Sequence, residues 1–314
     1  MISILFYKHQ DDPAPWLADL ARHLPQAQIR MWHPGDADPA DYALVWKPPL
    51  ELLQRRQGLK AVFNLGAGVD VLLGFLREHP FLLPPHVSLI KLDDAGMAAQ
   101  MNHYVGQAVL RHFRQMDAYG QLKQEMRWHV LPPKIQADYP IGVMGLGALG
   151  TQVASYLAAM GFPVRGWSRS RKHLAGVQCY SGEETLPVFL DGLQALVNMM
   201  PLTAQTENML DRTVFNCLAR GAHLINVARG AQVVDDDLLA ALSSGQLGGA
   251  TLDAFRTEPL PSGHPFWREP RIAITPHIAA LTERTESIRQ IASKIEALEK
   301  GESVGGIVDL ARGY

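Results

Sequence analysis

Short hydrophobic runs alternate with amphipathic segments along the first 92 residues. The runs are 2–7 (ISILFY), 42–46 (YALVW), 61–66 (AVFNLG) and 87–92 (VSLIKL). Short continuous apolar runs are typical of strands that are buried on both faces. Residues 13–24 and 49–56 show helical spacing, and each begins near a proline, where the missing N–H costs little. This alternation predicts a parallel sheet covered by helices.

A second series of the same kind follows residue 140. Residues 97–127 contain no proline, and most of them are expected to form one long helix before LPPK (131–134) interrupts the chain. The later strand-like runs are 141–145, 164–167, 195–200, 223–227, 249–255 and 271–275, and a last helix is expected at about 282–300. The pattern predicts an α/β protein with two doubly wound parallel-sheet domains and a ligand cleft between them.

Composition and charge limit the possible classes of protein. The 314 residues suffice for two domains, and 47% hydrophobic with 19% charged residues fits a soluble globular protein. A formal net charge of −2 argues against a dominant nucleic-acid role. No secretion signal or membrane-spanning run is evident. Cys179 and Cys217 form neither a CxxC pair nor a disulfide framework, so a reducing compartment is expected, with a cytoplasmic location. No metal site is expected.

The segment 145–150 (GLGALG) has the spacing G-x-G-x-x-G between a strand-like run and a helix-like segment. In that setting Gly145 allows a tight turn, Gly147 lets the backbone approach a pyrophosphate, and Gly150 lets helix and strand pack closely. A plain glycine-rich turn is the alternative. The context favours a dinucleotide site formed by Gly145, Leu146, Gly147, Ala148, Leu149 and Gly150.

The basic run 166–172 (GWSRSRK) follows the second strand-like run of this series. Ser168 stands about 20 positions beyond the glycine turn, where an acidic residue would accept a hydrogen bond from the ribose 2′-OH of NAD. A hydroxyl followed by Arg169 and Arg171 instead suits a 2′-phosphate, through charge-assisted hydrogen bonds. A solvated basic loop is the alternative. The run predicts NADP(H) as the cofactor.

Three polar residues follow strand-like runs in the second half: Arg229, Glu258 and His277. Since carboxyl ends of parallel strands meet at one edge of a sheet, these side chains are expected to converge. A histidine exchanges protons near neutral pH, a carboxylate orients its ring, and an arginine suits a substrate carboxylate. Each alone has an ordinary alternative, as a surface arginine, a loop glutamate or a capping histidine. Together they indicate an active site.

The chain resembles the D-isomer-specific 2-hydroxyacid dehydrogenases over nearly its whole length. The motifs are 64–70 (NLGAGVD), 142–154, 198–206, 224–255, 258–261, 264–267 and 275–280. Within this family, GWSRSRK and the C-terminal GIVDLARGY (306–314) are most similar to the bacterial glyoxylate/hydroxypyruvate reductase branch. Ser168 departs from the acidic residue common in NAD-dependent members, which again favours NADP(H).

The resemblance implies a role for each matching residue. Arg229 would bind the substrate's carboxylate and carbonyl, His277 would be the general acid, and Glu258 would support it. Asp253 would contact the nicotinamide carboxamide. The further implied cofactor residues are Pro201, Thr206, Val227 and Ala228. The implied substrate-binding residues, besides Arg229, are Ala67 and Gly68 through their backbone N–H groups.

The resemblance also implies a flavodoxin-like substrate (catalytic) domain, 1–96 plus 283–314, and a Rossmann NADP-binding domain, 97–282. The segment after Met97 would form much of a homodimer interface. The expected activity is NADPH-dependent reduction of small 2-oxoacids, glyoxylate to glycolate and hydroxypyruvate to glycerate. Neither a nucleic acid nor a membrane is an expected partner.

Three alternatives remain open. The first is a related dehydrogenase with a different 2-oxoacid, and the second is a nucleotide-sensing scaffold that binds proteins. A formate-type dehydrogenase is disfavoured, because that branch would carry Gln in place of Glu258. Trp46 and Trp128 are candidates for narrowing the substrate pocket, although a core role for Trp46 is equally compatible with its place after a strand-like run.

Overall fold

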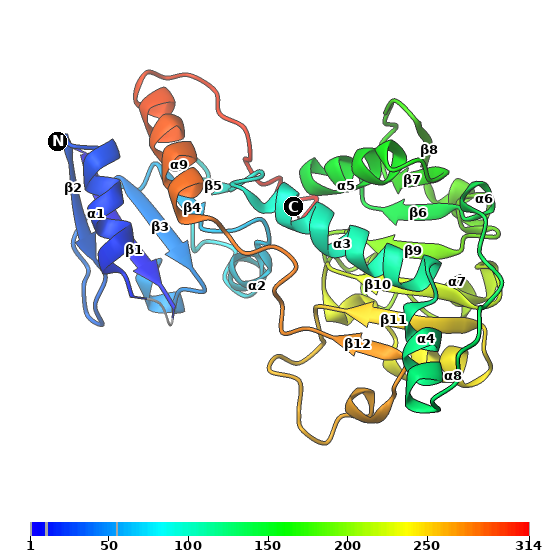
Figure 1. Ribbon diagram of the computed structural model, residues 1–314. Coiled ribbons are helices and arrows are strands. Elements are labelled where there is room, and N and C mark those ends of the chain that lie inside the picture. Colours follow the sequence, from blue (N-terminus) through cyan, green and yellow to red (C-terminus); the bar gives the residue numbers. More distant parts are fainter. Residues whose placement is uncertain (1, 10–11, 55, 314) are drawn as a thin grey trace. The chain divides into compact units, whose positions relative to one another are not determined.

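The computed structural model describes residues 2–9, 12–54 and 56–313 and divides into two compact units (Figure 1). One unit comprises Met1–Met97 and Thr282–Tyr314, and the other comprises Ala98–Leu281. The expected boundaries differ from these by one residue at each crossing. Tyr314 of the expected C-terminal motif lies outside the described residues, as does Arg55 of the segment 49–56. The functions assigned to the two units remain predictions.

The first unit is built on a parallel five-stranded sheet with the order β2-β1-β3-β4-β5. Its strands are β1 (Ile2–Lys8), β2 (Ala27–Met31), β3 (Tyr42–Trp46), β4 (Ala61–Asn64) and β5 (Ser88–Lys91). The order is that of flavodoxin-like folds. The apolar runs predicted four of these strands but not β2, because this edge strand (AQIRM) alternates polar and apolar residues.

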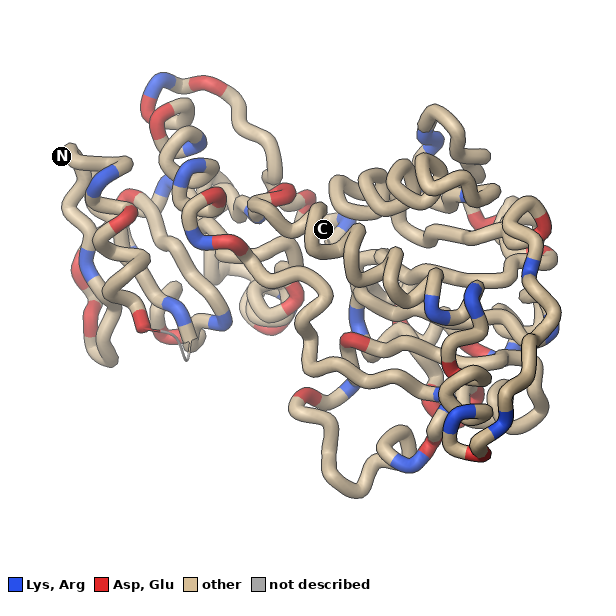
Figure 2. Tube along the Cα trace, in the orientation of Figure 1, with Lys and Arg blue, Asp and Glu red and all other residues tan. Residues whose placement is uncertain are grey.

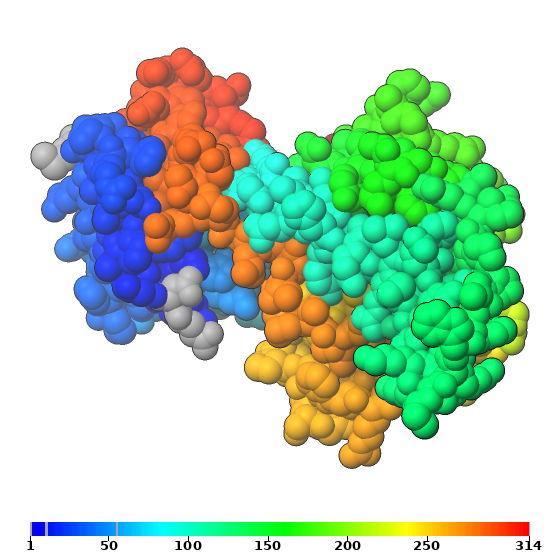
Figure 3. Space-filling model, in the orientation of Figure 1, coloured from blue at the N-terminus to red at the C-terminus, as the bar shows by residue number. Residues whose placement is uncertain are grey.

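The described residues of this unit form the helical segments α1 (Ala14–His23), η1 (Leu50–Leu52), α2 (Asp70–Glu78) and α9 (Arg284–Glu299). Helix α9, from the C-terminal part of the chain, packs against α1, and Figure 3 shows the two side by side in orange and blue. The last helix therefore returns to the N-terminal unit, which makes this unit discontinuous in sequence.

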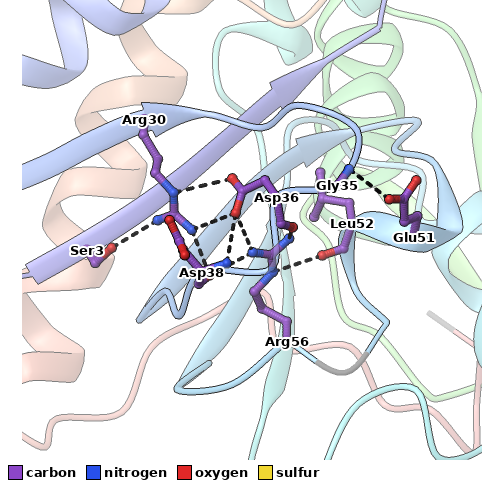
Figure 4. A network of polar contacts seen from close by, with 8 residues as sticks. All are labelled: Ser3, Arg30, Gly35, Asp36, Asp38, Glu51, Leu52 and Arg56. Carbon is purple, nitrogen blue, oxygen red and sulfur yellow. Dashed lines mark hydrogen bonds and ion pairs between the residues drawn. The ribbon is translucent and has the colours of Figure 1, made fainter.

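The helix expected at 49–56 is wrong: the described residues of this segment form only the 3-10 turn η1. So short a segment gains few hydrogen bonds for the cost of starting a helix. The buried guanidinium of Arg56 donates to the Leu52 carbonyl at 3.2 Å and to the Asp38 carbonyl at 2.7 Å. It also donates to the Asp36 carboxylate at 2.9 Å, which Arg30 shares (Figure 4). Side-chain bonds thus hold this connection without a regular helix.

The second unit contains a parallel seven-stranded sheet with the order β12-β11-β10-β9-β6-β7-β8. Its strands are β6 (Ile141–Met144), β7 (Val164–Ser168), β8 (Val177–Ser181), β9 (Ala195–Asn198), β10 (Ala222–Asn226), β11 (Leu247–Leu252) and β12 (Ile272–Ile274). This is the Rossmann order with one additional strand at its edge. Strand β8 was not predicted, because its sequence VQCYS lacks a continuous apolar run.

The helices of the second unit are α3 (Met97–Phe113), α4 (Met116–Gln124), α5 (Ala148–Ala159), α6 (Leu186–Leu190), α7 (Arg212–Cys217) and α8 (Asp235–Ser243). Its 3-10 turns are η2 (Gln136–Asp138), η3 (Glu183–Thr185), η4 (Gly230–Gln232) and η5 (Pro265–Arg268). The single long helix expected at 97–127 is wrong. Gln115 adopts a left-handed conformation with φ 57°, which ends one helix before the next begins. Its side chain donates to the Pro132 carbonyl at 2.7 Å.

Apolar clusters cover both faces of the seven-stranded sheet. Leu224 of β10 packs into one cluster with α6, α7 and α8, while its neighbour Ile225 packs into the other with α3 and α5. The central strands accordingly carry few charges, as their tan colour in Figure 2 shows. In the described part of the chain, no helix combines the length and apolar character needed to cross a membrane.

Candidate active site

The glycine turn joins β6 to α5 and leaves one open side. Gly145 has φ 98°, and a Cβ there would lie 2.7 Å from the Met199 carbonyl. A Cβ on Gly150 would lie 1.8 Å from the carbonyl oxygen of Gly145. Both positions therefore exclude a side chain. A Cβ on Gly147 would meet no atom within 4 Å, so the backbone there is open to an approaching group.

A pyrophosphate fits this open side. Gly147 is the N-cap of α5, and Gly147 and Ala148 are exposed. The N–H groups of a first helical turn have no intrahelical acceptor, and the helix dipole favours an anion there. Leu149 is half-buried, whereas Leu146 is 2% exposed and packs against Gly166 of β7. Leu146 thus anchors the turn, and the N-terminus of α5 is the part available to a phosphate.

The basic loop begins where β7 ends. Ser168 is the last residue of β7, is largely buried, and donates from its hydroxyl to the Ser170 carbonyl at 2.8 Å. Arg169, Arg171 and Lys172 follow on the exposed loop between β7 and β8, which carries blue in Figure 2. Cationic side chains therefore lie just beyond the end of β7, where a phosphate on the ribose would be bound in this fold. The Ser168 hydroxyl would exchange its internal bond for a phosphate oxygen.

His277 and Glu258 are in direct contact. The Nδ1 atom of His277 lies 3.0 and 2.9 Å from the two carboxylate oxygens of Glu258. Glu258 follows β11, and its Oε1 also accepts from the Phe255 N–H at 3.1 Å. Because the carboxylate favours the proton on Nδ1, the atom left for proton exchange is Nε2. The His277 side chain is 42% exposed, so its ring remains accessible.

Asp253 organises the loop that carries His277. Asp253 is 1% exposed, and its carboxylate accepts from the Thr275 hydroxyl at 2.6 Å and from the Ile278 and Ala279 N–H groups at 2.8 Å each. His277, between these donors, has φ 58°, a conformation that non-glycine residues adopt only when their surroundings impose it. Asp253 thus holds the Thr275 side chain before His277 and the backbone directly after it. Its implied contact with the nicotinamide carboxamide stays a prediction.

Arg229 follows β10, the strand next to β11. It is half-buried, and its Nη1 donates to the Ala228 carbonyl at 2.8 Å. A Cβ on Gly230 would lie 1.9 Å from the Phe255 carbonyl carbon, so the Arg229 loop packs directly on the segment leading to Glu258. The predicted residues Arg229, Glu258 and His277 therefore follow three neighbouring strands at one edge of the sheet.

The remaining predicted cofactor residues lie at the same sheet edge. The Thr206 hydroxyl donates to the Pro201 carbonyl at 2.7 Å, which closes the loop after β9. Val227 and Ala228 are each 7% exposed, so their side chains pack in the core. Sequence analysis did not single out the buried amides Asn198, Asn226 and Gln232. The only signal in the sequence was one asparagine inside each of the apolar runs 195–200 and 223–227. In the described part of the chain, no cluster of three or more His, Cys, Asp or Glu side chains is placed to bind a metal.

The predicted substrate residues of the first unit form a local cluster of their own. Trp46 ends β3, and a Cβ on Gly66 would lie 2.5 Å from its ring, so the indole lies against the loop after β4. Asn64 donates to the carbonyls of Gly66 and Gly68 at 2.9 Å each, which fixes this loop. Ala67 and Gly68 remain partly exposed. Trp46 is also partly exposed, so it is not a pure core residue.

The chain is similar in sequence to known proteins. A family model described as D-isomer specific 2-hydroxyacid dehydrogenase, NAD binding domain, matches residues 107–279. The glyoxylate/hydroxypyruvate reductase A of Serratia proteamaculans is 52% identical over 313 residues, which cover 100% of both chains. The protein of the same name from Yersinia enterocolitica is 48% identical with the same coverage.

Two solved structures are similar over the whole fold. A D-isomer specific 2-hydroxyacid dehydrogenase from Xanthobacter autotrophicus, in complex with NADPH, is 41% identical with a TM-score of 0.93 over 99% of both chains. An NADPH-dependent glyoxylate/hydroxypyruvate reductase from Sinorhizobium meliloti, in complex with NADP, is 34% identical with a TM-score of 0.91 over 100% of both chains. On the sheet order, the site geometry and these similarities, the chain belongs to the D-isomer specific 2-hydroxyacid dehydrogenase family.

Proposed function

We propose that this protein is an NADPH-dependent reductase of small 2-oxoacids, converting glyoxylate to glycolate and hydroxypyruvate to glycerate. The observation that carries the proposal is the His277–Glu258 pair, whose Nδ1–carboxylate distances are 3.0 and 2.9 Å. The two residues follow β12 and β11, and Arg229 follows the adjacent strand β10. The names of the relatives from Serratia and Yersinia support the same substrates.

The chain's own groups account for cofactor selection. The N-terminus of α5 would hold the pyrophosphate, because Gly147 and Ala148 are exposed there. Ser168, Arg169 and Arg171 would bind the 2′-phosphate, and no carboxylate stands at Ser168 to repel it. When bound, NADPH supplies the hydride for the carbonyl carbon of the substrate. The NADPH and NADP complexes of the two similar structures support this choice of cofactor.

Binding of the oxoacid is assigned to Arg229. A planar guanidinium donates two parallel hydrogen bonds to a carboxylate, and it also polarises a neighbouring carbonyl oxygen. Its backbone is held in an extended conformation, so the side chain starts from a defined position. We propose that the backbone N–H groups of Ala67 and Gly68, to which the family resemblance assigns this role, donate to the same substrate carboxylate.

The proton comes from His277. As the carbonyl carbon is reduced, negative charge develops on its oxygen, and Nε2–H of the imidazolium donates a proton to it. Glu258 stabilises the cationic ring through Nδ1 and prevents it from rotating. Asp253 holds the loop that sets the direction of the ring. Reduction therefore needs His277 protonated and Glu258 ionised.

The proposal includes the oligomeric state of the protein. We infer a homodimer formed through the segment after Met97, with the protein located in the cytoplasm. Along this segment, Met126 and Trp128 are 94% and 101% exposed, and large apolar side chains so placed mark association surfaces. Trp128 is then a candidate for lining the partner's substrate pocket, beside the role proposed for Trp46. Sedimentation analysis showing a monomer at all concentrations would contradict the homodimer.

The experiment that tests the function is a steady-state screen of NADPH and NADH oxidation. We expect glyoxylate and hydroxypyruvate to be reduced with NADPH, and phenylpyruvate and branched 2-oxoacids to have much lower kcat/KM. Equal kcat/KM for phenylpyruvate would contradict the small pocket. Tight NADPH binding without turnover of any 2-oxoacid would instead favour the nucleotide-sensing scaffold.

A further inference from the structure

Three buried side-chain amides meet at the carboxyl edge of the seven-stranded sheet. Asn198 ends β9, Asn226 ends β10, and Gln232 ends the 3-10 turn η4; each is 0% exposed. The Asn198 Nδ2 donates to Asn226 Oδ1 at 2.9 Å and to Gln232 Oε1 at 2.8 Å. The three amides thus form one connected unit, which we call the amide triad.

The amide triad holds the backbone of the Arg229 loop. Gln232 Oε1 accepts from the Arg229 N–H at 3.1 Å, and Asn226 Nδ2 donates to the Arg229 carbonyl at 3.1 Å. Asn226 Oδ1 accepts from the Ala228 N–H at 3.3 Å. Both peptide groups that flank the Arg229 side chain are therefore bonded to the triad.

The amide triad also holds the loop after β9. Gln232 Nε2 donates to the carbonyls of Met200 and Pro201 at 3.2 and 3.1 Å, and Asn198 Oδ1 accepts from the Met200 N–H at 3.2 Å. This loop packs on the glycine turn, because a Cβ on Gly145 would lie 2.7 Å from the Met199 carbonyl and 2.8 Å from the Met200 nitrogen. One set of bonds therefore ties the Arg229 loop to the proposed cofactor loops.

Gln232 is the link between the two loops. Its oxygen accepts from the Arg229 N–H, and its nitrogen donates to the carbonyls of Met200 and Pro201. Every side-chain nitrogen and oxygen of the amide triad has a hydrogen-bond partner. An apolar side chain of the same length would leave several buried polar groups unpaired, and the loops would move to find other partners. Displacements of about 1 Å in a substrate-binding group lower rates by up to about a hundredfold.

We propose that Asn198, Asn226 and Gln232 are positioning residues, which set the place of the Arg229 guanidinium relative to the bound cofactor. The inference rests on the proposed function through the role of Arg229. The amide triad does not touch the reacting atoms. It acts through the backbone at Arg229 and through the loop at 199–201.

The first test is Gln232→Met, which keeps the length of the side chain and removes its hydrogen bonds. We expect kcat/KM for glyoxylate to fall roughly ten- to a hundredfold. The affinity for NADPH, measured by fluorescence titration, should fall less, because the N-terminus of α5 and the basic loop are unchanged. An equal loss in both quantities, or no loss in either, would overturn the proposal.

Gln246→Met is the matched control. Gln246 also donates to two backbone carbonyls, those of Phe215 and Leu218, at 2.9 Å each. It precedes β11 and therefore lies at the opposite, amino-terminal edge of the sheet. Its loss should lower the melting temperature while leaving kcat/KM unchanged. If Gln246→Met lowered kcat/KM as strongly as Gln232→Met, the effect would be general destabilisation.

The second test is a double-variant cycle with Arg229→Lys. If Gln232 acts through Arg229, Gln232→Met should cause a much smaller further loss of kcat/KM in the Arg229→Lys background than in the wild type. The same fold-loss in both backgrounds would show that Gln232 acts independently of Arg229.

Amide hydrogen exchange separates this inference from the proposed function. Peptides covering 226–233 and 198–202 should exchange faster in Gln232→Met than in the wild type, and at the wild-type rate in Gln246→Met. A wild type that reduces neither glyoxylate nor hydroxypyruvate would contradict the proposed function alone. Unchanged exchange in Gln232→Met would contradict the positioning role, whatever the wild-type activity.

Discussion

The proposed reaction depends on individual polar atoms whose hydrogen-bond partners leave each of them a single role. Nδ1 of His277 is taken by the Glu258 carboxylate, so Nε2 alone remains for the substrate. The loop bonded to Asp253 holds His277 at φ 58°. Local backbone strain of this kind is maintained where it orients a functional group.

His277→Ala should slow glyoxylate reduction by about two to four orders of magnitude, because the general acid is lost. Glu258→Gln should also lower kcat for glyoxylate reduction, because an amide stabilises the protonated ring less than a carboxylate does. Steady-state rates of both variants with NADPH and glyoxylate would measure both effects. Unchanged turnover of His277→Ala would refute the assignment.

Arg169→Ala should weaken NADPH binding roughly ten- to a hundredfold, the loss expected for a charge-assisted hydrogen bond to the 2′-phosphate. NADH should be nearly unaffected, because it lacks that phosphate. Adding Ser168→Asp should shift preference toward NADH, since a carboxylate accepts from the free 2′-OH and repels the phosphate. The measurement is kcat/KM for both cofactors at fixed ionic strength. Equal losses for both cofactors would mean that the loop is merely solvated.

At the scale of elements, side-chain bonds replace regular structure in the connections of the first unit. Arg56 is buried, and its guanidinium joins η1 to the loop after β2 through Asp36 and Asp38. Burial tends to raise the pKa of the Asp36 carboxyl, but hydrogen bonds from Arg30 and Arg56 outweigh it, so this pKa lies below its usual 3.8. The bonded carboxylate therefore stabilises the folded state above pH 3.8, and this contribution is lost as the pH falls through the lower folded-state pKa.

Arg56→Met should lower the free energy of unfolding by roughly 1–3 kcal/mol, because the Leu52 and Asp36 carbonyls lose a buried donor while Arg30 still pairs with the Asp36 carboxylate. Arg30→Met is the matched control, since its side chain is 24% exposed against 1% for Arg56, and a smaller loss is expected. Urea unfolding followed by tryptophan fluorescence measures both. Equal losses for the two variants would contradict the central role of Arg56.

At the scale of the whole molecule, a pair of histidines makes folding sensitive to acid. The rings of His112 on α3 and His223 on β10 are stacked with centroids 4.8 Å apart. His223 is hydrogen-bonded to the Thr251 hydroxyl and His112 to the Tyr139 hydroxyl. Burial, reinforced by the charge of Lys134, lowers the pKa of His112 to about 4. Burial, followed by the charges of His112 and Arg111, lowers the pKa of His223 to about 3.

Both pKa values lie below the ordinary 6.5, so unfolding takes up protons. Stability is then complete above pH 6.5 and decreases as the pH falls toward 4 and 3. His112→Phe keeps the stacked ring and removes one titrating group, so its melting temperature should fall less between pH 7.5 and about 5 than that of the wild type. His86→Gln, at an exposed site outside the segment after Met97, should behave as the wild type. A variant that loses as much as the wild type would exclude the pair as the cause.

The sequence by itself determined the features that depend on neighbouring residues. Apolar runs predicted the central strands, and the glycine spacing at 145–150 predicted the β6–α5 turn, because backbone conformation there requires residues without a side chain. The predicted residues Arg229, Glu258 and His277 each follow a strand, and parallel strands place them at one edge. Family motifs assigned their roles.

Only the tertiary structure decided the features that join distant residues. The amide triad links positions 198, 226 and 232, and no local pattern marks its members as partners. The edge strands β2 and β8 lack continuous apolar runs, and at the break between α3 and α4 the Gln115 side chain bonds to the distant Pro132 carbonyl. Hydrophobic periodicity indicates which face of an element is buried. It does not indicate which other element packs against that face, or which groups its polar atoms form hydrogen bonds with.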